Sequence, residues 1–149
     1  MSSEKLTDDL MNVLKSAKPS DIAEFLDENP EDEKAFSSYM REMFKKKGIR
    51  QQEVFTRMGI SYGYGYKLIS GEKKTRQRDL IIELCLCSGF TLDEAQKALK
   101  LYGMAALYPK KPRDAVLIIA FNQEIYDTSE TDKLLKDHGM DELYKCTER

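Results

Sequence analysis

The fold is decided by a stretch in the first half of the chain that reads Gln51-Gln52-Glu53-Val54-Phe55-Thr56-Arg57-Met58-Gly59-Ile60-Ser61. Its apolar residues recur at helical spacing, so they fall on one face of a short helix. Gly59 supplies a tight turn after that helix, and Ser61 is placed to cap a second helix over residues 61–70. The pattern predicts a helix-turn-helix.

The charges along the chain are strongly segregated around this stretch. Residues 34–78 carry twelve Lys or Arg against three acids, a net charge of +9, while residues 1–33 have a net of −7 and residues 79–149 a net of −4. The whole chain of 149 residues therefore has a net charge of only −2. A compact basic segment between two acidic ones favours DNA as a partner, because duplex DNA is a dense polyanion.

Residues 34–90 resemble the phage-repressor-like (Cro/repressor, XRE-type) helix-turn-helix DNA-binding family. In that family a helix that begins with Gln precedes the recognition helix, and a Gly, a basic loop and two closing helices follow it. Gln51 and Gly71 stand at the matching positions. The resemblance implies a five-helix head. More loosely, the Leu-Tyr-Pro-x-x-x-Arg-Asp segment at 107–114 resembles helical regulators from Gram-positive bacteria.

The resemblance also implies which residues contact DNA. It places Gln51, at the amino end of the second helix, near a phosphate. Five residues would lie on the groove-facing side of the recognition helix: Ser61, Tyr62, Gly63, Tyr66 and Lys67. Three more would lie in the basic loop 72–78, which tracks the DNA backbone: Lys73, Lys74 and Arg76.

The recognition helix departs from the family in its composition. It carries Gly63 and Gly65, each of which costs about 1 kcal/mol relative to Ala inside a helix. It also offers tyrosines where the family usually presents Gln, Asn, Arg or Ser to base edges. Because tyrosine is enriched in protein interfaces, contact with another protein is the alternative interpretation of this helix.

The basic residues outside the recognition helix fall into two groups. The lysines at 45–47 end a predicted helix, where cations complement the helix dipole, and that structural interpretation is favoured for them. The other group has four cations within six residues, with only Glu72 and Asp79 as acidic neighbours: Lys73, Lys74, Arg76 and Arg78. A phosphate backbone would neutralise these four.

The remaining pattern is helical and shows no strand alternation, which predicts an all-α fold. We expect an acidic helical segment over 1–33, a DNA-binding head over 34–90 and a C-terminal helical repeat over 91–149. Within these, helices are predicted over 33–47, closed by Gly48, and over 77–87. Thr91 and Glu94 form a capping box for a further helix that ends near residue 101.

The C-terminal half contains an internal repeat. Residues 97–108 align with residues 133–144 at an offset of 36, and seven of the twelve positions are identical. Upstream, Arg78-Asp79 pairs with Arg113-Asp114 at an offset of 35. The unit predicts two stacked helical hairpins that bury each other's apolar faces, with Leu107 and Leu143 tucked inward.

Several classes of function have no support in the sequence. There is no Ser/His/Asp set, nucleotide-binding loop or metal-spaced cluster, so we expect neither an enzyme nor a cofactor. No apolar run approaches the roughly 18 residues of a membrane span, and a cytoplasmic protein is expected. Three cysteines without ligand spacing, at 85, 87 and 146, are expected to be free thiols.

The sequence therefore predicts a sequence-specific, DNA-binding transcriptional regulator. It would use helix 61–70 in the major groove of double-stranded DNA and the loop 72–78 on phosphates. The C-terminal repeat would form a homodimer or serve as a platform for a protein partner. The alternative is a protein-interaction module on the same scaffold, and a ligand sensor is a third hypothesis for which the sequence offers no pocket-forming polar set.

Overall fold

The residues that the structure describes form helices, turns and loops without a strand, which confirms the predicted all-α fold. The computed structural model describes residues 11–12, 15, 18–21 and 33–143. The chain divides into two compact units, residues 1–31 and residues 32–149. In the first unit the described residues include a short 3-10 helix, η1 (Pro19–Asp21). The rest of the acidic helical segment that was predicted over 1–33 lies largely outside the described residues.

Helix α3 (Glu33–Lys47) occupies the range predicted for it. Four apolar residues at helical spacing are buried along it: Phe36, Met40, Met43 and Phe44. The helix ends before Gly48, whose φ of +66° lies in the left-handed region that residues with a side chain rarely adopt. α3 packs against α5 (Tyr62–Ser70) and α7 (Leu92–Tyr102).

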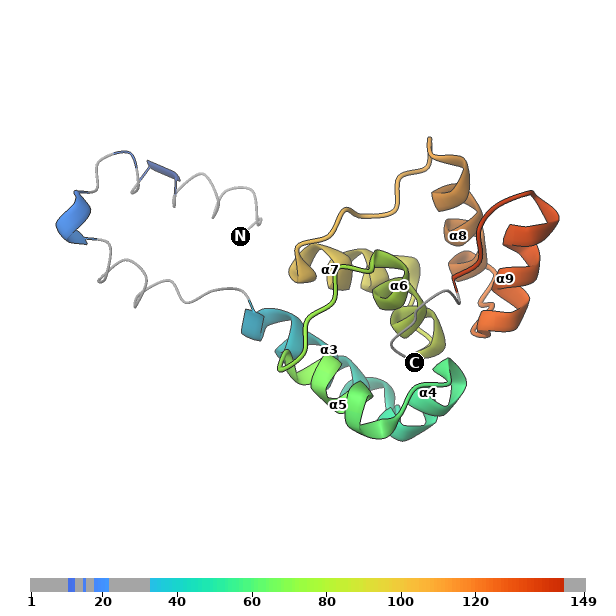
Figure 1. The fold of residues 1–149 in the computed structure, drawn as a ribbon, viewed down its shortest axis with the longest axis horizontal. Helices are drawn as coiled ribbons and strands as arrows, with labels where there is room; N and C mark the ends of the chain where they lie inside the picture. The colour runs from blue at the N-terminus through green and yellow to red at the C-terminus, as the bar shows by residue number, and fades with distance from the viewer. Residues whose placement is uncertain (1–10, 13–14, 16–17, 22–32, 144–149) are drawn as a thin grey trace. The chain divides into compact units, whose positions relative to one another are not determined.

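Helix α6 (Arg78–Cys87) is the central helix of residues 32–149 (Figure 1). Every residue from Leu80 to Cys87 is buried, because neighbouring helices cover α6 on several sides. It packs against α4 (Gln51–Met58), α7 and α9 (Thr128–Asp137). Helix α8 (Pro112–Asn122) contacts α7 and α9.

The start of α7 confirms the capping box expected from the sequence. The Thr91 hydroxyl accepts a hydrogen bond from the Glu94 N–H at 3.2 Å, and the Thr91 N–H donates to the Glu94 carboxylate at 2.8 Å. Two N–H groups at the helix start are thereby satisfied by local side chains.

Two of the three cysteines lie on α6. Cys85 and Cys87 are buried free thiols, as predicted. Burial raises the pKa of Cys87 to about 11, so its thiol stays protonated and unreactive at neutral pH. Cys146 lies outside the described residues.

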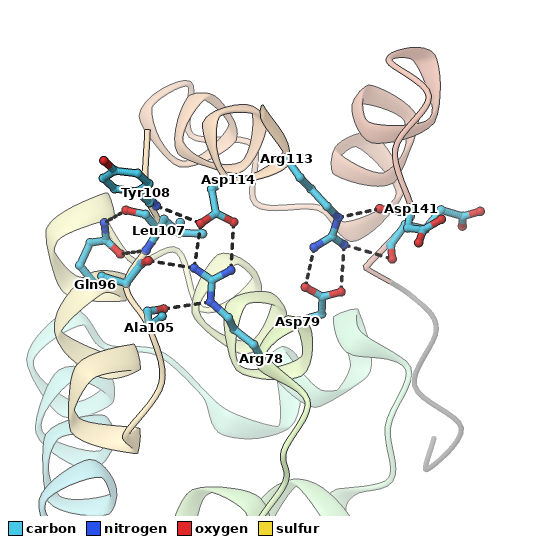
Figure 2. Close-up of polar contacts among 11 residues, drawn as sticks. Arg78, Asp79, Gln96, Ala105, Leu107, Tyr108, Arg113, Asp114 and Asp141 are labelled. Carbon is cyan, nitrogen blue, oxygen red and sulfur yellow. Dashed lines mark hydrogen bonds and ion pairs between the residues drawn. The ribbon is translucent and has the colours of Figure 1, made fainter. Parts of the chain in front are cut away.

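The two Arg-Asp dipeptides at the starts of α6 and α8 exchange ion pairs (Figure 2). Arg78 donates two hydrogen bonds to the Asp114 carboxylate, both 2.9 Å long. Arg113 donates two to the Asp79 carboxylate, at 2.8 and 2.9 Å. Because each pair is held by two parallel N–H···O bonds, the two helix starts are fixed against each other by a reciprocal clasp.

The same arginines hold the loops that follow α7 and α9. Arg78 donates to the carbonyl oxygens of residues 105–106, both at 2.9 Å. Arg113 donates to the carbonyl oxygens of residues 141–142, at 3.1 and 3.4 Å. These carbonyls are 36 residues apart in the sequence, so aligned positions receive equivalent hydrogen bonds.

The correspondence extends to the two leucines of the aligned segments. The Leu107 N–H donates to the Gln96 side chain at 2.7 Å, and the Leu143 N–H donates to the Asp132 carboxylate at 2.7 Å. Gln96 and Asp132 are also 36 residues apart. Both leucines are buried, as their spacing after the glycines predicted.

Candidate nucleic-acid interface

The turn between α4 and α5 has the local structure that its residues predicted. Gly59 adopts the left-handed conformation, with φ +72°, and its N–H bonds to carbonyl groups of the last turn of α4. Ile60 then buries its side chain in the core. The Ser61 side chain accepts a hydrogen bond from the Tyr64 N–H at 3.1 Å and caps α5.

One face of α5 is exposed and the other is buried. The buried face carries Gly65, Leu68 and Ile69. The exposed residues include every recognition-helix position that the sequence placed toward DNA: Ser61, Tyr62, Gly63, Tyr66 and Lys67. The structure therefore brings these five residues to one surface of the molecule.

The two exposed tyrosines are fixed to α4. The Gln52 amide donates to the Tyr66 hydroxyl at 3.1 Å, and the hydroxyls of Thr56 and Tyr62 are hydrogen-bonded at 3.3 Å. Both rings also pack against Phe55, whose ring centre is 5.3 Å from that of Tyr66 and 6.4 Å from that of Tyr62. Hydrogen bonds at the hydroxyl groups and packing on Phe55 thus hold both tyrosine rings in place.

Gly65 explains why α4 and α5 lie so close together. A Cβ at this position would be 2.5 Å from a ring carbon of Phe55, which is far inside normal contact. Gly63 is different, because a Cβ there would meet nothing within 4 Å. Packing therefore requires glycine at position 65, whereas glycine at position 63 leaves open space on the exposed face.

A surface hollow of about 460 Å³ joins the exposed face of α5 to the amino end of α4. It gathers four of the predicted site residues, Gln51, Gly63, Tyr66 and Lys67. Arg41 of α3 also lines it, and sequence reasoning did not assign that residue to the site. The only signal for Arg41 was its contribution to the basic charge of residues 34–78.

The basic loop after α5 folds back along the same region. The Lys73 N–H donates to the Lys67 carbonyl at 3.1 Å, and the Lys73 ammonium lies 5.1 Å from the centre of the Tyr64 ring. The Thr75 N–H donates to the Tyr102 hydroxyl of α7 at 2.8 Å, which anchors the loop to the body. The predicted loop residues Lys73, Lys74 and Arg76 are exposed.

Several cations counted in the basic segment make contacts within the fold, Arg78 and Lys47 among them. Arg78, predicted to face phosphates with its three neighbours, is instead bound to Asp114, which the sequence did not indicate because the two are 36 residues apart. Lys47 pairs with Glu94 and also donates to the Gly89 carbonyl at 3.3 Å. Without these two, the segment 34–78 keeps ten cations against three acids, a net of +7.

A second hollow, of about 530 Å³, lies where α4 meets α9. Polar residues dominate its lining, among them Arg57, Ser129, Lys133, Asp137 and Glu142. The Arg57 guanidinium at its edge donates to the Cys87 carbonyl at 2.8 Å and so ties the end of α4 to α6. No sequence pattern indicated this hollow, because its walls come from segments distant in the chain.

Two further features are absent from the residues that the structure describes, a membrane-spanning helix and a metal-binding cluster. None of their helices is long and apolar enough to cross a membrane. No group of three or more His, Cys, Asp or Glu side chains among them is arranged to hold a metal ion. Comparisons of the whole chain with protein-family models, curated proteins and solved structures find no match.

Proposed function

We propose that this chain binds double-stranded DNA as a transcriptional regulator, with α5 in the major groove. The observation that carries the proposal is the shared surface of α5, the amino end of α4 and the basic loop. Exposed Tyr62, Tyr66 and Lys67 lie on α5, Gln51 lies across the hollow, and the loop folds back onto α5 through Lys73.

The dimensions and charge of this surface suit a duplex. The nine residues of α5 make a helix roughly 13 Å long at 1.5 Å per residue, and the major groove is about 12 Å wide and admits one helix. Arg41 of α3 and Lys67 of α5 line the hollow beside the helix, and Lys73 of the loop lies against Tyr64, so these cations are positioned near α5 for contact with phosphates. Gln51 and the loop would grip phosphates and set the position of α5.

The alternative, a protein partner on the tyrosine-rich face, shares the same residues. Half-exposed tyrosines are common in protein interfaces. The charge favours DNA, because Arg41 and Lys67 line the hollow beside this face, the loop with Lys73 folds back onto α5, and a polyanion would neutralise these cations together.

A homodimer would give the interface useful specificity, since one helix-turn-helix contacts few base pairs. We place the dimer contact on the C-terminal repeat. In support, two large apolar side chains are exposed in the second hairpin (α8 and α9) and the loop before it: Ile119 on α8 is 55% exposed and Tyr108 in the loop is 49% exposed. Burial of these two side chains against a second copy would contribute to the contact.

Binding to duplex DNA as a function of salt tests the phosphate contacts. The double variant Lys73→Ala/Lys74→Ala should weaken binding to all duplexes about equally and reduce the slope of log K against log salt by roughly 0.9 per lost contact. The matched control is Lys110→Ala/Lys111→Ala, which removes the same charge from an exposed loop elsewhere. If the slope of log K against log salt is the same for both double variants, the loop does not contact phosphates.

A further inference from the structure

The exposed face of α5 offers bases an unusual set of side chains. The helix reads Tyr-Gly-Tyr-Gly-Tyr-Lys-Leu-Ile-Ser and contains no Arg, Asn or Gln. Those residues make the bidentate hydrogen bonds by which most major-groove readers distinguish bases. Lys67 is the one charged donor on the helix. Any direct readout by α5 must therefore depend heavily on its tyrosines.

Hydrogen bonds hold the tyrosine hydroxyls against α4, so the rings supply most of the surface that the two residues offer to a partner. Tyr62 and Tyr66 are 46% and 43% exposed, while their hydroxyls are hydrogen-bonded to α4 side chains. Because both rings also pack on Phe55, they are ordered before any partner arrives. An ordered, half-exposed ring contributes mainly apolar surface to a contact.

One base-edge group in the major groove is apolar, the methyl group of thymine. Gly63 lies on the same exposed face, and the space where its side chain would begin is open to 4 Å. That opening lets the groove floor approach the backbone of the helix beside the rings. The face thus combines two apolar contacts with an unobstructed backbone.

We propose that the rings of Tyr62 and Tyr66 read two thymine methyl groups in the major groove. This inference rests on the proposed DNA-binding function. The two residues are four positions apart, so they are separated by roughly 6 Å along the helix axis. Base pairs are stacked about 3.4 Å apart, so the two thymines lie roughly two base steps from each other when α5 follows the groove.

Uracil substitution tests this inference without changing the protein. A preferred duplex is first selected from a random pool with the full chain, and each thymine is then replaced in turn by deoxyuridine, which removes only the methyl group. Loss of one buried methyl contact should weaken binding about fourfold at each of two positions. Replacement of thymines outside the footprint is the control and should have no effect.

Variants of the two tyrosines identify which ring reads which methyl. At one of the two thymine positions, uracil substitution should no longer weaken binding by the Tyr66→Ala variant. At the other position, it should no longer weaken binding by the Tyr62→Ala variant. Tyr66→Phe and Tyr62→Phe keep the rings and should keep the uracil penalty. Circular dichroism of each variant checks that the helices are retained.

The outcomes separate the inference from the function on which it rests. If the parent binds duplexes but shows no uracil penalty at any position, the methyl readout is wrong and DNA binding stands. A penalty that persists in both alanine variants also overturns the readout, because another residue then contacts the methyl groups. If the parent binds no duplex even at the lowest salt, both proposals are wrong.

Discussion

At the scale of single residues, Gly65 shows how a locally unfavourable choice is explained by packing. Glycine inside a helix is destabilising by about 1 kcal/mol relative to alanine. The sequence shows this cost but not its reason, because Phe55 comes from the preceding helix. In the structure a Cβ at position 65 would overlap three carbons of the Phe55 ring. The absence of a side chain is what allows α4 and α5 to pack together.

The two glycines of α5 form a matched pair for testing this explanation. Gly65→Ala should lower the free energy of unfolding by about 1 to 3 kcal/mol, because the added carbon overpacks the contact with Phe55. Gly63→Ala should raise it by up to about 1 kcal/mol, because its Cβ enters open space and alanine favours the helix. Denaturant unfolding measures both. Equal effects of the two substitutions would contradict the packing explanation.

At the scale of helices and turns, the sequence predicts the features that depend on neighbouring residues. The left-handed Gly59, the Ser61 cap and the Thr91–Glu94 capping box each involve residues within a few positions of one another. Long-range pairings were not predictable in this way. Arg78 is a cation in a basic stretch until the fold brings Asp114 to it, and Arg41 reaches the candidate site only because α3 packs against α5.

The reciprocal Arg-Asp clasp gives a second matched pair, now between helices. The Asp114 side chain is 5% exposed and accepts hydrogen bonds from Arg78 and from the Tyr108 N–H, whereas the Asp79 side chain is 35% exposed. Asp114→Asn should therefore cost about 3 kcal/mol of unfolding free energy. Asp79→Asn, in the more exposed pair, should cost less than about 1 kcal/mol.

The ion pair between Arg78 and Asp114 makes the free energy of unfolding depend on pH in a defined direction. Burial alone would raise the pKa of the Asp114 carboxyl, but the hydrogen bonds from Arg78 and Tyr108 hold it below its ordinary value of 3.8. A carboxyl with a lowered pKa in the folded state stabilises the protein above about pH 4, and this stability is lost as the pH falls through the folded-state pKa. Asp114→Asn should therefore flatten the decline of unfolding free energy below pH 4. If the unfolding free energy of Asp114→Asn declines below pH 4 as steeply as that of the parent, Asp114 does not dominate the clasp. Equal losses of unfolding free energy in Asp114→Asn and Asp79→Asn would lead to the same conclusion.

At the scale of the whole molecule, the second hairpin is part of the core that supports the proposed DNA-binding surface. Helix α9 packs on the central helix α6, and the Thr128 hydroxyl donates to the fully buried Glu83 carboxylate at 2.8 Å. Tyr108 lies in the loop before α8 and Ile119 lies on α8, and we place the dimer contact on these two side chains.

Truncation tests the role of this hairpin in assembly. Deletion of residues 126–149 keeps Tyr108 and Ile119 but removes α9, on which α8 packs. It should therefore give a less stable, aggregation-prone or dissociated protein with weaker duplex binding, because one half-site contact replaces two. Sedimentation of the full and truncated chains, alongside duplex binding, measures both effects. A full chain that is monomeric and binds no more tightly than the truncated one would rule out the dimer and leave the hairpin to another partner.

The measurement that tests the central claim most directly is binding of the full chain to a random duplex, titrated against salt. If Lys73, Lys74 and Arg76 each neutralise one phosphate, log K should fall linearly with log salt with a slope of about −2.7 or steeper. The Lys73→Ala/Lys74→Ala variant should have a clearly shallower slope. A parent slope near zero, or no binding at the lowest salt, would contradict DNA binding by this surface.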